Sequence, residues 1–248
     1  MADYKKARLD VEAGIEIAKK LHANRMLGYL YASQAFLDNV AGNIGSSYKI
    51  SQELDAIGQR HNHPELQSLA HRIRGDIYIL VRSYDQAQEE YQLGYELGTQ
   101  DYWGLDNLVR KGFAEFNIGQ SEKGMANLHR GIDLAQALGF GIVEIRGMQF
   151  LSYVHASRKE WQITRQITEK LERMARIRNL PVVGIMAKQI SIIADLDQTG
   201  PEENIDKFEY LLKMIGDQDL SYVPLRILIQ LIRLKNDSGV DCQREITR

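Results

Sequence analysis

Cysteine is nearly absent from this sequence of 248 residues, in which Cys242 is the single example. One cysteine forms no internal disulfide and, alone, no cysteine-based zinc site, which excludes the disulfide-stapled class of secreted domain. The chain also lacks an excess of either charge, because 31 Lys and Arg residues face 33 Asp and Glu residues. The formal net charge of −2 therefore creates no strong field for nucleic acid or for an anionic membrane.

Long apolar runs are missing as well. The most apolar late segment, residues 225–234, contains Arg226, Gln230 and Arg233 and is much shorter than the roughly 20 residues that span a bilayer. The first residues of the chain lack the apolar core of a signal peptide. We therefore expect a cytoplasmic protein with no membrane partner and no direct contact with nucleic acid.

Proline is scarce, with four residues at positions 64, 181, 201 and 224. Long stretches are thus free of the strongest helix breaker, and good helix formers such as Ala, Leu, Glu and Lys fill them. Apolar and small residues recur at the i, i+3/4, i+7 spacing of a helix, whereas the alternation typical of strands does not appear. The sequence predicts an all-α chain.

An internal repeat organises these predicted helices. Similar patterns of small and large residues begin at positions 7, 44, 87, 124, 163 and 205, which gives a period near 40 residues. A period of this length indicates a repeat of two helices, here called helix A and helix B. Helix B begins at each of these positions, and helix A is predicted at residues 24–40, 65–81, 104–117, 142–157, 181–196 and 221–235.

Two of the repeats carry a family resemblance. Gly75 in one helix A is followed twelve residues later by Ala87 in helix B, and Gly112 is followed in the same way by Gly124. This spacing resembles that of tetratricopeptide repeats, most closely over residues 64–139. The longer period is similar to that of the variants in bacterial LuxR-type ATP-dependent regulators and in nucleotide-cyclase signalling proteins. The resemblance implies one domain over residues 1–248, a right-handed superhelical solenoid of about six helix pairs that forms part of a longer protein.

No catalytic constellation is visible in the sequence. The glycine-containing loop at residues 42–47 lacks the lysine of a phosphate-binding P-loop. His61, His63 and His71 lie close together in sequence, but no cysteine or fixed carboxylate completes a set of metal ligands. We therefore predict that the protein is not an enzyme and has neither a metal site nor a cofactor.

The family resemblance also implies that the A helices line a concave groove. Projection of the repeat onto this groove selects a mixed set of polar and aromatic side chains. The predicted partner-binding residues are Tyr29, Ser33, Arg72, Asp76, Asp106, Phe113, Phe116, Asn117, Ser152 and His155. Such a surface could hold an extended or helical peptide, with polar groups fixing its backbone and apolar groups supplying burial. The alternative for each residue is ordinary core packing.

The last predicted helix is apolar on nearly every side and therefore needs neighbours all round. Its residues Tyr222, Leu225, Ile229 and Ile232 are predicted to contact either a further repeat of a longer protein or a second copy of the chain in a homodimer. We expect the former, because the chain also begins with a helix B that has no helix A before it.

The repeat and the missing active site together predict a protein-interaction module. We expect it to serve as the sensor or scaffold region of a signalling or transcription-regulatory protein and to bind a peptide or protein segment in the groove. The alternative is a sensor for a peptide or small molecule that acts by closure of the groove. An enzyme would instead require perturbed carboxylates or histidines in one enclosed pocket.

Overall fold

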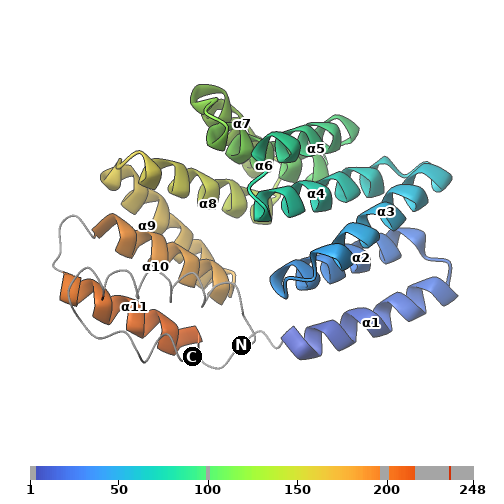
Figure 1. The fold of residues 1–248 in the computed structure, drawn as a ribbon, viewed down its shortest axis with the longest axis horizontal. Helices are drawn as coiled ribbons and strands as arrows, with labels where there is room; N and C mark the ends of the chain where they lie inside the picture. Colours follow the sequence, from blue (N-terminus) through green and yellow to red (C-terminus); the bar gives the residue numbers. More distant parts are fainter. Residues whose placement is uncertain (1–3, 99–100, 196–200, 216–234, 236–248) are drawn as a thin grey trace. The chain divides into compact units, whose positions relative to one another are not determined.

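A computed structural model of the chain describes residues 4–98, 101–195, 201–215 and 235 (Figure 1). These residues form eleven α-helices, and the same ranges contain no strand. The all-α helical-repeat fold predicted from the sequence is confirmed. Contacts between residues divide the chain into two compact units, one of residues Tyr4–Leu151 and one that begins at Ser152, and each is described by itself.

The first unit alternates between B and A helices along the chain. Its B helices are α1 (Tyr4–Lys20), α3 (Ile44–His61), α5 (Tyr84–Leu97) and α7 (Ser121–Ala137). Its A helices are α2 (Asn24–Val40), α4 (Pro64–Leu80), α6 (Tyr102–Asn117) and α8 (Gly141–Ser157), the last of which continues into the second unit. All four A helices begin and end within about two residues of the positions that the sequence repeat predicted, which is the usual uncertainty of a helix boundary.

The described residues of the second unit form the end of α8 and three further helices, α9 (Trp161–Ile177), α10 (Pro181–Asp195) and α11 (Pro201–Ile215). Helix α10 packs against both α9 and α11. Of the last predicted A helix, residues 221–234 lie outside the described residues. Tyr222, Leu225, Ile229 and Ile232 fall in that segment, so the predicted homodimer or next-repeat contact remains a prediction.

The A helices of the first unit pack against one another as well as against their B partners. Helix α4 contacts both α2 and α6, whereas the described residues give α3 and α5, or α5 and α7, no comparable contact. Helices that approach closely lie on the inner side of a curved stack, and those that diverge lie on the outer side. The A helices therefore form the inner side of this unit, as the resemblance to tetratricopeptide repeats implied.

Small residues set the distance between helices A and B. A Cβ atom placed on Gly112 of α6 would lie 2.8 Å from the carbonyl oxygen of Gly124 on α7, and one placed on Gly124 would lie 2.6 Å from that of Gly112. A Cβ atom on Gly75 would lie 2.4 Å from the ring of Tyr91, which is buried between α4 and α5. The predicted small-large-small pattern is thus the packing pattern of the A and B helices.

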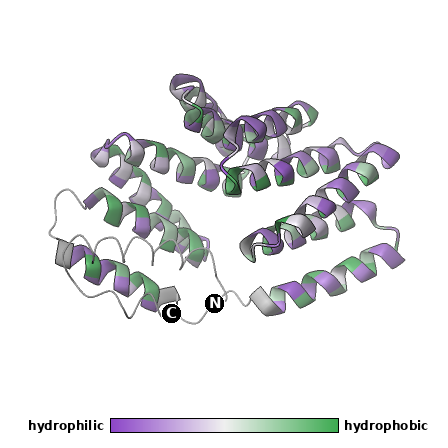
Figure 2. Cartoon of the chain, viewed as in Figure 1, coloured by the Kyte–Doolittle hydropathy of each residue, from purple (hydrophilic) through white to green (hydrophobic). Residues whose placement is uncertain are grey.

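Hydrophobic and hydrophilic residues share most helices of the first unit (Figure 2). The hydrophobic ones supply a core of fully buried side chains that includes Leu66, Leu69, Ile73, Leu105 and Leu108. Burial of such side chains contributes about 1.5–3 kcal/mol each. Within the described ranges, no helix has both the length and the apolar character needed to cross a bilayer.

Candidate functional site

An ion cluster connects three A helices on the inner side of the first unit. At its centre is Asp106 of α6, whose side chain is 0% exposed. Its carboxylate accepts a hydrogen bond from Arg110 Nε at 3.0 Å and two from Arg146 Nη1 on α8, at 3.0 and 3.1 Å. Asp106 and Arg110 lie one turn apart on the same face of α6, and Arg146 reaches them from the next A helix.

A second carboxylate extends the cluster to α4 and α5. Asp76 of α4 accepts hydrogen bonds from Arg72 Nη1 at 3.0 Å, from the Tyr91 hydroxyl at 2.8 Å and from Arg110 Nη1. Arg110 therefore binds both acids and joins α4 to α6. We call Arg72, Asp76, Asp106, Arg110 and Arg146 the ion cluster.

Burial and charge set the protonation of the ion cluster. Burial raises the pKa of Asp106, but Arg110, Arg146 and Arg72 outweigh this effect and hold its pKa below the ordinary value. Burial lowers the pKa of Arg110, but Asp106 and Asp76 have the larger combined effect and raise it. Burial and the like charge of Arg110 lower the pKa of Arg146. The Asp106 carboxylate is therefore ionised at neutral pH, and the guanidinium groups of Arg110 and Arg146 keep their protons there.

Aromatic side chains flank the ion cluster at the start of α6. The Trp103 ring stacks on Tyr29 of α2 with 5.9 Å between ring centroids, and it packs edge to face with Tyr102 at 4.7 Å. The Arg72 guanidinium lies over the same indole, 5.7 Å from its centroid. Tyr102 in turn contacts Phe140, which precedes α8. Arg72 thus contacts both Asp76 and the Trp103 ring, and the other rings pack around Trp103 and Tyr102.

A second aromatic pair lies toward the other end of the same helix face. The rings of Phe113 on α6 and Phe150 on α8 stack with centroids 4.6 Å apart, and both are partly exposed. Asn117, one turn further, is exposed, and its Nδ2 donates to the Phe113 carbonyl oxygen at 2.8 Å. Together with the ion cluster, Tyr29 and Trp103, the residues Phe113, Phe150 and Asn117 form a surface that we call the A-helix face.

Six of the ten residues predicted from the sequence belong to the A-helix face and are Tyr29, Arg72, Asp76, Asp106, Phe113 and Asn117, of which Asp106 is fully buried. A seventh, Phe116, lies where α6 packs against Gly124 of α7. An eighth, Ser33, is exposed on α2, and its hydroxyl donates to the Tyr29 carbonyl oxygen of its own helix.

Ser152 and His155 occupy packing positions of the repeat. Ser152 is fully buried and follows Gly112 by 40 residues, so it has the place of the small helix-A residue. His155 is also buried, and its Nδ1 pairs with the carboxylate of Glu160 just before α9. The residues of α8 that contact the A-helix face are Arg146 and Phe150, which project from a different side of that helix.

Sequence reasoning missed Arg110, Arg146, Trp103 and Phe150. A signal for the first was present, because Arg72 and Asp76 are four residues apart on one A helix, and Asp106 and Arg110 are four apart on the next. The arginine comes first in the pair on α4 and the aspartate comes first in the pair on α6. An arginine of one helix can therefore bind the aspartate of its neighbour. Arg146 lies 40 residues after Asp106, which is one period of the repeat.

The histidines of the sequence do not form a metal site among the described residues. The rings of His61 and His63 have centroids 6.4 Å apart, and His71 pairs through Nδ1 with Glu90 at 2.8 Å, beside Arg74. No group of three or more His, Cys, Asp or Glu side chains in the described part of the chain has the geometry to hold a metal ion.

Comparisons with known proteins agree with this architecture. No protein-family model matches the sequence, and no curated protein matches it. A signal-transduction ATPase with numerous domains from Pyrococcus horikoshii, which has a tetratricopeptide repeat sensor, is similar in structure over 97% of this chain with a TM-score of 0.57 and 15% sequence identity. The match covers 39% of that protein, so this chain spans about two fifths of its length.

BtubC from P. vanneervenii is also similar in structure. The match covers 98% of this chain and 94% of BtubC, with a TM-score of 0.53 and 13% identity. What these proteins share with this chain is the fold. It is an all-α helical repeat of the tetratricopeptide kind.

Proposed function

We propose that this chain is a protein-interaction module that binds a peptide or protein segment on its A-helix face. The observation that carries the proposal is the A-helix face itself, where guanidinium groups, an exposed amide and two stacked aromatic pairs lie on consecutive A helices. Arginine and aromatic side chains are the types most enriched at protein interfaces, because they combine a large contact area with specific hydrogen bonds.

The two halves of this face suit the two parts of peptide recognition. At one end, Arg146 is 27% exposed in its side chain, although it is bound to a fully buried acid. At the other end, Phe113 and Phe150 leave part of their stacked rings open to an apolar side chain, and Asn117 stands beside them in solvent. Polar groups would then fix the backbone or an end of the segment, and the rings would supply burial.

A signalling role fits the comparison with the Pyrococcus protein, whose tetratricopeptide repeats are described as a sensor. We propose that the present chain likewise serves as a sensor or scaffold region of a signalling or transcription-regulatory protein and performs no catalysis itself. If it acts as a sensor that closes on a ligand, X-ray scattering should show a smaller radius of gyration when the ligand is bound. A scaffold would keep its dimensions.

A phage-displayed library of random peptides would test the binding function. Peptides enriched on the purified chain are synthesised, and their affinities are measured by fluorescence polarisation. Asn117→Arg introduces a bulky charge at an exposed position of the A-helix face, and we expect it to weaken binding at least about tenfold, or about 1.4 kcal/mol.

The matched control is Gln136→Arg on α7, an exposed position on a B helix, and we expect it to change the affinity less than about twofold. Both variants should keep the melting temperature of the original chain. Enriched peptides that bind both variants equally well would place the binding surface elsewhere and contradict the proposal.

A further inference from the structure

The outer side of the first unit has a hollow between two B helices. Helices α3 and α5 both pack against α4, but among the described residues they have no comparable contact with each other. The space between them measures about 400 Å³ and is lined by five residues of α3 together with Arg74 of α4 and Glu90 of α5. Ligand pockets in proteins are commonly about 300–1,000 Å³ in volume. We call this space the outer hollow.

Two carboxylates and one guanidinium group meet in the outer hollow. Asp55 Oδ2 accepts hydrogen bonds from Arg74 Nη1 and Nη2 at 3.3 and 3.4 Å, and Glu90 Oε2 accepts one from Arg74 Nε at 2.9 Å. His71 Nδ1 lies 2.8 Å from the same Glu90 oxygen and carries no charge unless it is protonated. Burial raises the pKa of Glu90, but hydrogen bonds from His71 and Arg74 together hold its pKa below the ordinary value. Arg74 can balance only one of the two acids, so the group lacks one positive charge.

Acceptor atoms in the outer hollow remain available to a ligand. None of the described residues donates a hydrogen bond to Glu90 Oε1. Gln59 donates through Nε2 to Asp55 Oδ1 at 3.2 Å, which leaves its own amide oxygen as an acceptor. Gln52 is exposed and adds a second amide. A ligand that brings both a positive charge and several N–H donors would satisfy these oxygens.

A metal ion does not fit this set of groups. Arg74 already contacts both carboxylates, and its positive charge would repel a divalent cation placed between them. In the described part of the chain, no group of three or more His, Cys, Asp or Glu side chains could hold a metal ion. The missing charge is also a single one. The outer hollow therefore suits an organic cation.

The positions of the oxygens favour an ammonium group over a guanidinium group. A guanidinium group binds a carboxylate best through two parallel N–H bonds, one to each oxygen. Arg74 and Gln59 already occupy both oxygens of Asp55, and Arg74 and His71 contact Glu90 Oε2. Neither carboxylate can therefore offer two open oxygens. Single oxygens on different side chains match the compact ammonium group, which has three donors that can rotate.

The walls of the outer hollow suit the rest of a lysine side chain. Tyr48, which is 41% exposed, and Ala56 both line the space. An aromatic ring attracts a cation, and apolar wall atoms can contact the long methylene stem of lysine. Helix α5 contains four acidic residues and no Lys or Arg, so its field also favours the approach of a positive charge.

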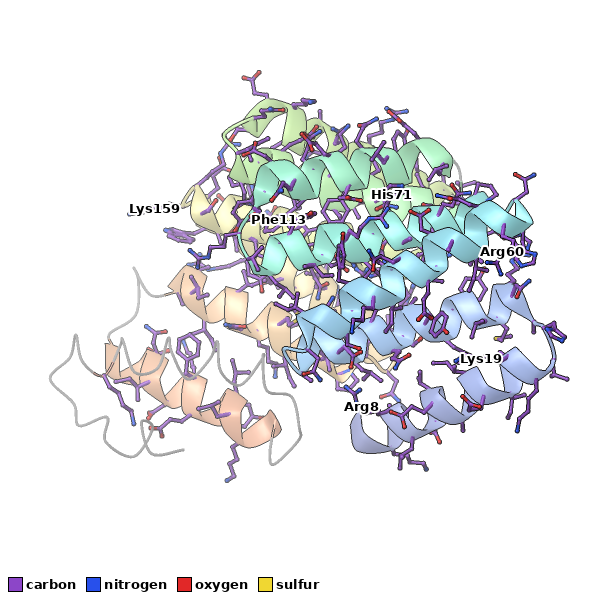
Figure 3. All side chains as sticks on the ribbon, turned by 45° about the vertical axis from the view of Figure 1, so that its right-hand side comes forward. Arg8, Lys19, Arg60, His71, Phe113 and Lys159 are labelled. Carbon is purple, nitrogen blue, oxygen red and sulfur yellow. The ribbon has the colours of Figure 1, made fainter. Side chains whose placement is uncertain are left out.

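We propose that the outer hollow binds an ammonium group of a protein partner, supplied by a lysine side chain. The N-terminal amine of a partner has the same chemistry and is the other possible source. This site adds a second interaction surface to the function proposed above and does not depend on peptide binding to the A-helix face. His71, beside the outer hollow, and Phe113, in the A-helix face, lie apart on the molecule (Figure 3).

Binding of the cation can be measured with small salts. The side-chain amide signals of Gln52 and Gln59 in the ¹⁵N-labelled chain are followed by NMR at pH 7.5 during titration with ethylammonium chloride. Sodium chloride and guanidinium chloride at equal ionic strength are the controls. We expect ethylammonium to shift both signals saturably and more than either control salt. Shifts no larger than those caused by sodium chloride would overturn the site, and a stronger response to guanidinium would contradict the preference for an ammonium group.

Synthetic hexapeptide pools identify the source of the ammonium group. Matched pools contain lysine or, in its place, norleucine, which has a similar stem without the charge, and each pool is made with a free and with an acetylated N-terminus. We expect the acetylated lysine pool to bind at least about tenfold more tightly than the acetylated norleucine pool in fluorescence polarisation. A preference for the free N-terminus alone would assign the ammonium group to the end of the partner. Equal binding of all four pools would overturn the proposal.

Two variants test whether the outer hollow is responsible. Glu90→Gln removes one of the two acids and should abolish the preference for lysine, whereas Glu89→Gln, at the neighbouring exposed acid of α5, should change the affinity less than about twofold. Circular dichroism checks that each variant is folded. Gln52→Lys tests the site from an exposed position, because its own ammonium group would compete with the ligand, and Gln136→Lys on α7 is its matched control.

The two binding surfaces fail independently of each other. Asn117→Arg, in the A-helix face, should leave binding of the lysine pool unchanged. A preference for lysine that survives both Glu90→Gln and Gln52→Lys, or that Asn117→Arg removes, would overturn the outer hollow as its site.

Discussion

Replacement of Asp106 by asparagine (Asp106→Asn) removes the central charge of the ion cluster with little change in shape. Asp106 is fully buried and accepts three hydrogen bonds from two arginines. In the variant, Asp76 would be the one acid left in the ion cluster beside three arginines. The NH2 group of the new amide would also point its hydrogens at the N–H groups of Arg110 or Arg146. Loss of one partner from a buried ion pair typically costs about 3–5 kcal/mol.

We expect a value near the lower end of this range, about 3 kcal/mol, for two structural reasons. Arg110 keeps its bond to Asp76, and Arg146 is exposed enough to reach water. For a chain of this size the loss corresponds to a decrease in melting temperature of about 6–12 °C. Urea denaturation followed by far-ultraviolet circular dichroism at pH 7 measures the free energy directly. Asp133→Asn, at an exposed position on α7, is the matched control and should change stability by less than about 0.5 kcal/mol.

The pH dependence of this effect follows from the lowered pKa of Asp106. Burial opposes ionisation, but Arg110 and Arg146 overcome it, so the folded protein binds the proton less tightly than the unfolded chain does. The stabilisation is therefore fully present above the ordinary Asp pKa of about 3.9 and is lost as the pH falls below it through the folded pKa. The difference between the original chain and the variant should shrink below about pH 4. Equal stability of the two proteins at pH 7, or a difference that persists unchanged into acid, would refute this account of the cluster.

Two further substitutions test the packing of the A and B helices. Gly112→Ala should destabilise the chain by about 1–3 kcal/mol in urea denaturation, because the new methyl group would lie 2.8 Å from the backbone oxygen of Gly124. Gly45→Ala is the control, because a methyl group added at this position of α3 has nothing within 4 Å, and it should be neutral or stabilising. Equal effects of the two changes would show that α6 and α7 can separate freely. Tyr91→Phe should cost about 1–2 kcal/mol, because it removes the hydroxyl donor to Asp76. Burial and the charge of Asp76 raise the pKa of Tyr91, so the variant should lose one tyrosine that resists alkaline titration in ultraviolet absorption.

Local sequence alone determined the helices and their order. The spacing of small residues at Gly75, Ala87, Gly112 and Gly124 predicted which helices are A and which are B. The structure places the three glycines at close contacts between helices and buries Ala87 completely. The sequence shows this pattern because a helix has a fixed period. A close contact between two helices needs one small residue, and the period alone decides at which positions such residues recur.

The partners of the polar side chains were decided by tertiary structure. Asp76 and Arg110 are 34 residues apart, and Asp106 and Arg146 are 40 apart, so their contacts depend on the distance and rotation between whole helices. The same rotation places Arg146, and not Ser152, beside Asp106. A helix turns by about 100° per residue, so an error of one or two positions in aligning a weak repeat moves a side chain from the A-helix face to the packing interface. Three arginines and two aspartates form one cluster because α4, α6 and α8 pack side by side, and no single helix contains all five residues.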